Sequence, residues 1–117
     1  IVERDPADSN YRVLKENRER LEGMRDARGR LLEVIELPTP GVVPGPDGRL
    51  PASYANFYFA NAAVLVPVFD CETDREAIAI LEKAIPDRPI VPIPGRDLVL
   101  GLGAVHCLTQ QEPTGPV

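Results

Sequence analysis

The residue with the clearest chemical potential is Cys107, which follows the glycine-rich run Gly101-Leu-Gly103. Glycines in such a turn let the backbone come close to whatever occupies a neighbouring site. A cysteine is a competent nucleophile once it ionises, which requires a nearby cation or a positively charged substrate. Free cysteines are also among the residue types most often buried. The residues alone therefore leave two interpretations of Cys107 open, a nucleophile or a small apolar core residue, and favour the second.

The only histidine in the sequence, His106, directly precedes Cys107. We expect residues 105–109 to form a short apolar strand, and adjacent side chains of a strand point to opposite faces. His106 should then point away from Cys107, and we interpret it as a structural histidine. If Cys107 is catalytic, its acid/base partner must come from outside these residues.

The carboxylates that could hold a cationic group show no spacing that forces two of them onto one face. We interpret each as solvated surface: Asp70, Glu72, Asp97 and Glu112. The second cysteine, Cys71, lies in an acidic turn after a predicted strand and is interpreted as an incidental exposed thiol. The two cysteines have neither metal-site spacing nor the pattern of a disulfide framework.

Composition limits the classes of protein that fit. The chain has 117 residues, 44% hydrophobic and 26% charged, which is typical of one folded domain rather than a disordered segment. Its net charge of −5 argues against a nucleic-acid partner. The absence of a membrane-length apolar run and of a leader predicts a reduced, cytoplasmic protein. Because the chain starts at Ile1 and its only methionine is Met24, we expect a piece of a longer protein.

Hydrophobic periodicity predicts the secondary structure. Residues 10–22 have the spacing of an amphipathic helix with Asp8 or Ser9 as its N-cap. Residues 73–85 form a second helix, for which Thr73-x-x-Glu76 predicts a capping box. The predicted strands are 31–37, 57–60, 62–69 and 89–93, and Pro67 argues that the third of these ends or lies at a sheet edge there. A Pro/Gly-rich loop joins the two halves.

The order strand, helix, strand occurs twice. Residues 2–4, 10–22 and 31–37 are echoed by 62–69, 73–85 and 89–93. A repeated unit of this kind indicates modules that bury their faces against neighbours. Two such modules leave an open core, which again indicates that this chain belongs to something larger.

Two sequence blocks resemble a known family. Residues 49–61, RLPASYANFYFAN, are similar to the Leu-Pro-x-Ser-Tyr-x-Asn-Phe block of agmatine deiminases and bacterial peptidylarginine deiminases. Residues 101–113, GLGAVHCLTQQEP, resemble the cysteine motif of the same family. The second block is long enough to be specific, and it reverses the interpretation of Cys107 that the residues alone favour.

The resemblance implies an α/β fold, a five-bladed propeller of which this chain supplies about two modules. We expect a C-terminal portion with a first module at 1–37, the Pro/Gly-rich loop at 38–52 and a last module with the cysteine motif at 53–117. The resemblance also implies a hydrolase for a small cationic guanidino substrate, with Cys107 as nucleophile, Gly101 and Gly103 at the substrate, and no metal or organic cofactor. The acid/base histidine and the guanidinium-binding carboxylates would come from the remaining propeller modules or a homo-oligomer partner.

Two positions depart from the family pattern, because Leu102 replaces a glycine and Ala104 replaces an asparagine in many members. Leu102 could narrow the pocket, which puts agmatine itself in question. The leading prediction is an agmatine deiminase-like hydrolase, and peptidylarginine or another guanidino compound is the alternative substrate. A different class of protein is also open: a truncated, non-catalytic module that folds by associating with another chain.

Overall fold

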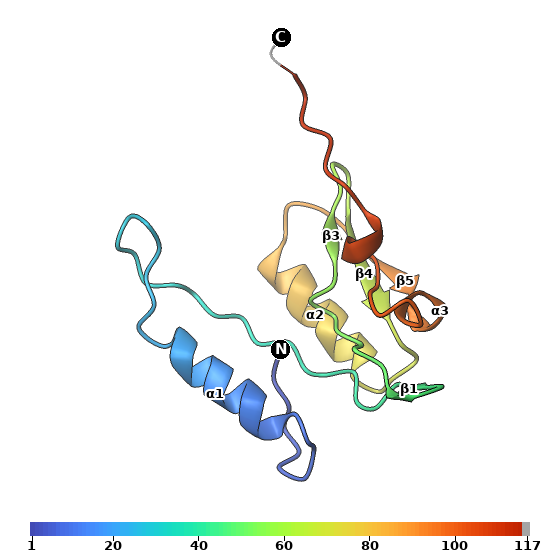
Figure 1. The fold of residues 1–117 in the computed structure, drawn as a ribbon. Helices are drawn as coiled ribbons and strands as arrows, with labels where there is room; N and C mark the ends of the chain where they lie inside the picture. The colour runs from blue at the N-terminus through green and yellow to red at the C-terminus, as the bar shows by residue number, and fades with distance from the viewer. Residues whose placement is uncertain (116–117) are drawn as a thin grey trace.

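The computed structural model describes residues 1–115, so the last two positions of the expected 53–117 module lie outside the described residues. The chain divides visibly into an N-terminal helix with long connecting segments and an α/β unit that holds the core (Figure 1). The helix α1, Tyr11–Leu21, has no buried residue, whereas the core cluster draws on residues from Leu37 to Val99.

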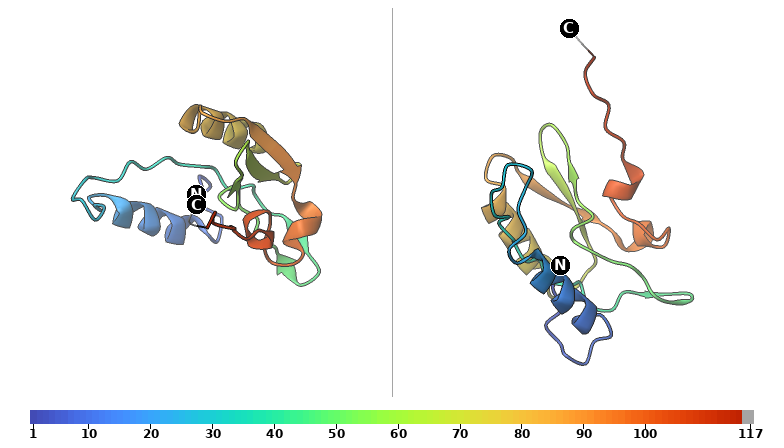
Figure 2. Two further views of the ribbon diagram at one scale, coloured as in Figure 1. Left: turned by 90° about the horizontal axis from the view of Figure 1, so that it is seen from above. Right: turned by 60° about the vertical axis from the view of Figure 1, so that its left-hand side comes forward.

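A β-α-β unit forms the centre of the structure. Strand β4 (Val64–Val68) pairs in parallel with β5 (Ile90–Pro94), and the helix α2 (Asp74–Ala84) connects them. The side chains of Val64 and Val66 are fully buried, and burial of a side chain of this size contributes about 1.5–3 kcal/mol. In Figure 2, α2 covers one side of the sheet, and the C-terminal segment lies on the other side. The predicted strands 62–69 and 89–93 and the helix 73–85 are thereby confirmed within a few residues.

The third strand of this sheet, β3 (Tyr58–Phe59), pairs antiparallel with the first two residues of β4. The sheet order is therefore β3-β4-β5, with β4 in the middle. Pro67 pairs with Ile93 of β5 but lies beyond the reach of β3. The prediction of a strand end or sheet edge at Pro67 is thus wrong for β4 as a whole, which has a partner strand on each side. It is right for Pro67 itself, because β3 does not extend to this residue and the missing N–H removes no hydrogen bond of the sheet.

The start of α2 is held by a carboxylate rather than by the predicted capping box. Thr73 is the N-cap but makes no side-chain cap hydrogen bond, and its hydroxyl donates to the Thr39 carbonyl at 3.1 Å. Glu76 instead forms an ion pair with Arg4. Asp74 accepts the Phe69 N–H at 3.1 Å, and it also accepts the Cys71 N–H at 3.1 Å. The sequence signal found the helix start but assigned the wrong hydrogen bonds, because tertiary partners take both side chains.

The buried Tyr54 ties the preceding loop to this helix start. Its ring is fully buried, and its hydroxyl donates to Asp74 at 2.6 Å and contacts the Thr73 hydroxyl at 2.9 Å. The phenol therefore satisfies its polar group inside the core, as buried tyrosines generally do. Loop residues 53–56 are fixed to the β-α-β unit through this contact.

The N-terminal half is less regular than predicted. The helix over 10–22 is confirmed as α1, although its N-cap is Asn10 rather than Asp8 or Ser9. Residues 31–37 form no strand. Leu31 makes an isolated bridge with Arg25, and the next residue after this segment, Pro38, makes one with Val2. A strand needs a continuous partner edge, and this part of the chain offers single residues instead. The predicted repeat is therefore wrong, because the N-terminal half does not form a complete β-α-β unit. The parallel Val2–Pro38 bridge corresponds to the strand pairing that the repeat predicted.

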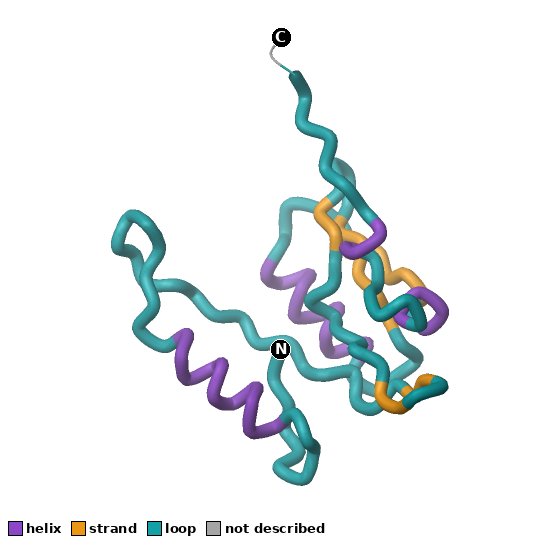
Figure 3. Tube along the Cα trace, in the orientation of Figure 1, coloured by secondary structure: helices purple, strands orange, loops and turns teal. Residues whose placement is uncertain are grey.

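Two further elements were not predicted. The Pro/Gly-rich loop contains a small hairpin, β1 (Pro44–Gly45) and β2 (Gly48–Arg49), and the short helix α3 (Arg96–Val99) follows β5. Figure 3 shows how much of the chain is loop between these pieces. No helix within residues 1–115 combines the length and the apolar character that crossing a bilayer requires. The division of the chain at 37/38 and 52/53 and its C-terminal placement stay predictions.

Replacing Asp74 by Asn should destabilise the fold. An amide turns one acceptor into a donor that faces the Phe69 and Cys71 N–H groups, so at least one charge-assisted hydrogen bond is lost. We expect a loss of about 2–4 kcal/mol in the free energy of unfolding, measured by urea denaturation. Glu82→Gln, at an exposed position of the same helix, is the matched control and should change it by less than about 0.5 kcal/mol. Equal effects of the two variants would contradict the role assigned to Asp74.

Tyr54 should make stability fall at alkaline pH. Burial, followed by the hydrogen bond to Asp74, raises the pKa of Tyr54 above its usual value. The unfolded chain ionises near pH 10 while the folded chain keeps the proton, so this stabilisation is complete below about pH 10 and is lost as pH rises toward the raised pKa. The free energy of unfolding should fall by up to about 1.4 kcal/mol per pH unit above pH 10. Urea titrations should show a smaller slope for Tyr54→Phe, while Tyr11→Phe keeps the wild-type slope.

Candidate functional site

Cys107 lies on a single 3₁₀ turn, η1 (His106–Leu108), and not on the predicted strand 105–109. The residue before the turn, Val105, has helical dihedral angles and is buried together with Ala104. These two side chains anchor the turn in the protein, while Cys107 is exposed. The prediction of a strand is wrong because the apolar residues before Cys107 serve as this anchor rather than as one face of a sheet.

Asn56 holds the cysteine turn through three hydrogen bonds. Its Nδ2 donates to the Cys107 Sγ at 3.0 Å, and its Oδ1 accepts the Cys107 N–H at 3.3 Å. Its backbone carbonyl accepts the His106 N–H at 3.1 Å. A backbone N–H can only donate, so the amide oxygen must face it and the NH₂ group is left for the sulfur. This is the contact that fixes both the position of Cys107 and the polar environment of its sulfur.

Sequence reasoning missed Asn56 as a site residue, although it stands inside the block 49–61. No local pattern marks it, because its role depends on a contact with Cys107, 51 residues further along the chain. The turn that carries Asn56 is held by two hydrogen bonds. The Ser53 hydroxyl accepts the Ala55 N–H at 3.2 Å, and the Ser53 carbonyl accepts the Asn56 N–H at 3.2 Å. With Tyr54 buried between them, Asn56 is a polar side chain on a rigid loop. What the sequence did not give is that this loop meets the cysteine turn.

The two glycines predicted to lie at the substrate differ in their surroundings. A Cβ at Gly103 would lie 2.6 Å from the Cys107 Cβ and 2.9 Å from its Sγ, so only glycine allows this close approach. A Cβ at Gly101 would meet the Leu98 carbonyl oxygen at 3.4 Å, which is an ordinary contact. Gly103 therefore shapes the space beside Cys107, and the substrate-binding role of both glycines stays a prediction.

His106 is exposed, and the argument that excluded it as a base no longer applies. Successive residues of a 3₁₀ turn are about 120° apart, not on opposite faces as in a strand. The structural contacts of His106 are made by its backbone, whose carbonyl accepts the Thr109 hydroxyl at 2.8 Å. That the acid/base partner of Cys107 comes from outside this chain stays a prediction.

Cys71 differs from Cys107 in every respect that matters for reactivity. It is half-buried rather than exposed, so the prediction of an exposed thiol is wrong. Its Sγ donates to the Phe69 carbonyl at 3.4 Å. Burial, followed by the charge of Asp74, raises the pKa of the Cys71 thiol. A thiol kept protonated in this way is a poor nucleophile.

The four carboxylates considered as a substrate clamp are all exposed, as predicted: Asp70, Glu72, Asp97 and Glu112. The loop residue Asp70 has a φ of 56° and stands 3.9 Å from the Arg96 guanidinium. Within residues 1–115, no three His, Cys, Asp or Glu side chains gather in a way that could hold a metal ion.

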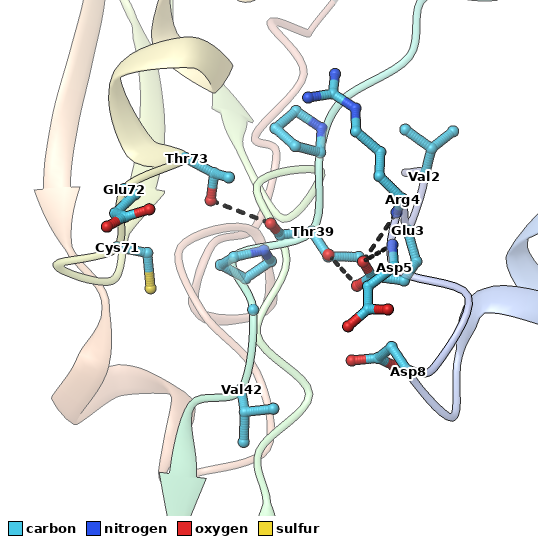
Figure 4. A pocket seen from close by; sticks show the side chains of 13 residues that line it. Val2, Glu3, Arg4, Asp5, Asp8, Thr39, Val42, Cys71, Glu72 and Thr73 are labelled. Carbon is cyan, nitrogen blue, oxygen red and sulfur yellow. Dashed lines mark hydrogen bonds between the residues drawn. The ribbon is translucent and has the colours of Figure 1, made fainter.

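A cavity of about 420 Å³ lies between the N-terminal segment, the loop at Thr39 and the start of α2 (Figure 4). Its acidic wall is engaged in internal contacts. Glu3 accepts the Thr39 hydroxyl at 2.5 Å, and Asp8 forms an ion pair with Arg49 at 2.6 Å. Cys107 is not among the lining residues. This cavity is therefore a feature of the junction between the two halves, and the candidate site is the exposed cysteine turn.

The chain is similar to known proteins over nearly its whole length. The model of the Porphyromonas-type peptidyl-arginine deiminase family matches residues 1–113. An agmatine deiminase from Pseudomonas fluorescens is 39% identical and is matched over 93% of this chain and 34% of its own length. An agmatine deiminase from Pseudomonas aeruginosa is likewise 39% identical over 93% of this chain and 34% of its own length.

Solved structures give the same answer for the fold. A Porphyromonas gingivalis protein solved as a candidate arginine deiminase superposes with a TM-score of 0.92 at 36% identity, over 97% of this chain and 34% of its own. The agmatine deiminase of Enterococcus faecalis gives a TM-score of 0.84 at 32% identity, over 93% of this chain and 34% of its own. The chain thus spans about a third of the length of the relatives it matches, and the α/β fold class is confirmed. The chain belongs to the Porphyromonas-type peptidyl-arginine deiminase family.

Proposed function

We propose that this chain carries the nucleophile of a hydrolase that converts a guanidinium group into a urea. The observation that supports this most directly is the environment of Cys107. Its thiol is exposed and receives an N–H from Asn56 at 3.0 Å, whereas structural cysteines are usually buried and apolar. An N–H donor stabilises the thiolate in preference to the thiol.

Agmatine is the proposed substrate, because the proteins 39% identical to this chain are named agmatine deiminases. Peptidyl-arginine is the second candidate, since the matching family is named for it. Both substrates present a planar cation on an aliphatic arm, and the net charge of −5 suits a cation in general. A cytoplasmic location is part of the proposal, because both cysteines are free, as expected in a reducing compartment.

The reaction proceeds in two steps. The Cys107 thiolate attacks the guanidinium carbon, a carbon–sulfur bond forms, and one nitrogen leaves as ammonia after taking up a proton. Water then attacks the same carbon of the thiouronium, the carbon–sulfur bond breaks, and the products are a ureido compound and the free thiol. A guanidinium is a poor electrophile, so covalent catalysis with precise positioning is needed. The positive charge of the bound substrate also favours the thiolate.

Asn56 fits this scheme as the group that holds the nucleophile ready. Its Oδ1 is bonded to the Cys107 N–H, so the amide cannot rotate without losing that bond. The NH₂ group therefore stays directed at the sulfur before and after attack. Gly103 leaves the space beside the same sulfur free of a side chain. Such preorganisation lowers the cost of aligning the reacting atoms.

The remaining catalytic groups are proposed to lie in the rest of the longer protein or in a second copy. A general acid must protonate the leaving ammonia, and carboxylates must hold the guanidinium. Several large apolar side chains of the N-terminal half are exposed and suited to packing against the remaining propeller modules: Val13, Leu31, Leu32 and Ile35. The propeller itself is part of this proposal.

Cys107→Ala in the full-length protein should abolish formation of the ureido product. Losing a covalent nucleophile removes both steps, so kcat should fall by more than about 10³-fold. The measurement is colorimetric detection of the ureido group with agmatine and with arginyl peptides. Cys71→Ala is the matched control, because its thiol is held protonated, and it should retain activity. A wild-type protein without activity on either substrate would favour the non-catalytic module, and an active Cys107→Ala variant would remove the nucleophile assignment.

Asn56→Ala should slow the reaction without unfolding the protein. A hydrogen bond to a charged group contributes about 1.5–3 kcal/mol, so kcat/KM should fall by about 10- to 150-fold. The alkylation rate of Cys107 by iodoacetamide should also fall, because the sulfur loses the N–H that Asn56 directs at it. Asn61→Ala, in an exposed turn of the same block, should leave both rates unchanged. If Asn56→Ala leaves the alkylation rate unchanged, the proposed contact with the thiolate is wrong.

A further inference from the structure

Leu102, close to Cys107, has a backbone conformation that a leucine rarely adopts. Its φ is 64°, in the left-handed region where a side chain crowds the backbone and where glycine is the usual residue. Its side chain is 73% exposed, so burial of apolar surface does not offset this strain. Strained residues that lack such compensation are concentrated at functional sites.

The loop that carries Leu102 is held firmly next to the nucleophile. The Leu102 N–H donates to the Val99 carbonyl at 2.9 Å, and the Gly101 N–H donates to the Leu98 carbonyl at 3.0 Å. The next residue, Gly103, lies against the Cys107 side chain. Consecutive Cα atoms are about 3.8 Å apart, which places the Leu102 Cα within about 8 Å of the Cys107 Cβ.

Exposed apolar side chains stand close to Cys107 along the chain. Leu108, directly after the cysteine, is 69% exposed, and Leu102 on the adjoining loop is 73% exposed. Apolar side chains beside a nucleophile cannot hold a guanidinium, which needs carboxylates. They can contact the aliphatic part of the molecule that bears it.

We propose that Leu102 is a specificity-determining residue, which packs along the aliphatic arm of the substrate when the guanidinium carbon is at the Cys107 Sγ. This inference rests on the proposed function and adds to it the part of the substrate that this loop recognises. The left-handed backbone turns the loop so that Gly103 can touch Cys107 and Leu102 can stand beside it. A substrate with an aliphatic arm gains this contact, whereas its guanidinium is held by groups other than Leu102.

Three variants of the full-length protein separate the side chain from the backbone strain. Leu102→Asn removes the apolar surface but introduces a residue that tolerates the left-handed region. Leu102→Gly removes the side chain and also the backbone strain. Leu102→Met keeps an apolar side chain of similar length. We expect the Asn and Gly variants to raise the KM for agmatine about tenfold, the effect typical of losing about one apolar contact. Their kcat and the iodoacetamide alkylation rate of Cys107 should stay within about twofold, and Met should restore the wild-type KM.

Leu100→Asn is the matched control, because Leu100 is an exposed leucine of the same turn with an ordinary φ of −57°. Its KM should stay within about twofold of wild type. An unchanged KM in Leu102→Asn overturns the inference while leaving the guanidine hydrolase intact. A joint fall in kcat and alkylation rate overturns it in favour of a purely positional role for the loop. A wild-type protein that turns over no guanidine compound refutes the proposed function and this inference with it.

Discussion

The side chain of Asn56 joins two segments that lie 51 residues apart in sequence, and the candidate site depends on this contact. The amide oxygen accepts the Cys107 backbone N–H, and the amide nitrogen donates to the Cys107 sulfur. One planar group therefore fixes both the backbone and the side chain of Cys107. Without it, a three-residue 3₁₀ turn would have little to hold it, because such turns are short and their hydrogen bonds are poorly aligned. The exposed thiol is thereby given a defined position although it lies on the surface.

A chain of polar contacts leads from this amide back into the core. Asn56 stands two residues after Tyr54, whose hydroxyl donates to Asp74, and Asp74 in turn organises the β4–α2 connection through the Phe69 and Cys71 N–H groups. The same carboxylate that begins the helix therefore anchors the loop that positions Cys107. Cys71 lies inside this network and is kept protonated, whereas Cys107 lies at its outer end. The different environments of the two cysteines follow from one arrangement of backbone and carboxylate.

How much of this could be predicted from the sequence depended on whether the signal was local. The helix at 74–84 and the strands beside it were predictable, because their apolar periodicity and their length are properties of a few adjacent residues. The failures at 31–37 and 105–109 have a common cause: both are apolar runs, and periodicity does not say whether a partner strand exists. The Thr73-x-x-Glu76 pattern was present, but the two side chains make tertiary contacts in place of the capping bonds. The Thr73 hydroxyl contacts Tyr54, and the Glu76 carboxylate accepts a hydrogen bond from Arg4. Cys107 was recognisable only from a long motif, and Asn56 only from a contact between distant segments.

The distribution of polar groups in this chain fits the proposal that it carries the nucleophile without a complete site. Cys107 needs a donor, a rigid loop and a glycine that can approach it closely, and all three are local to the β-α-β unit and its two adjoining turns. Holding a guanidinium needs several carboxylates that converge on one point, and the candidates in this chain are exposed and separate. Carboxylates that close together repel one another unless a cation or surrounding dipoles balance them. In the proposed function, the carboxylates come from the rest of the longer protein, and their charges meet only where the substrate cation compensates them.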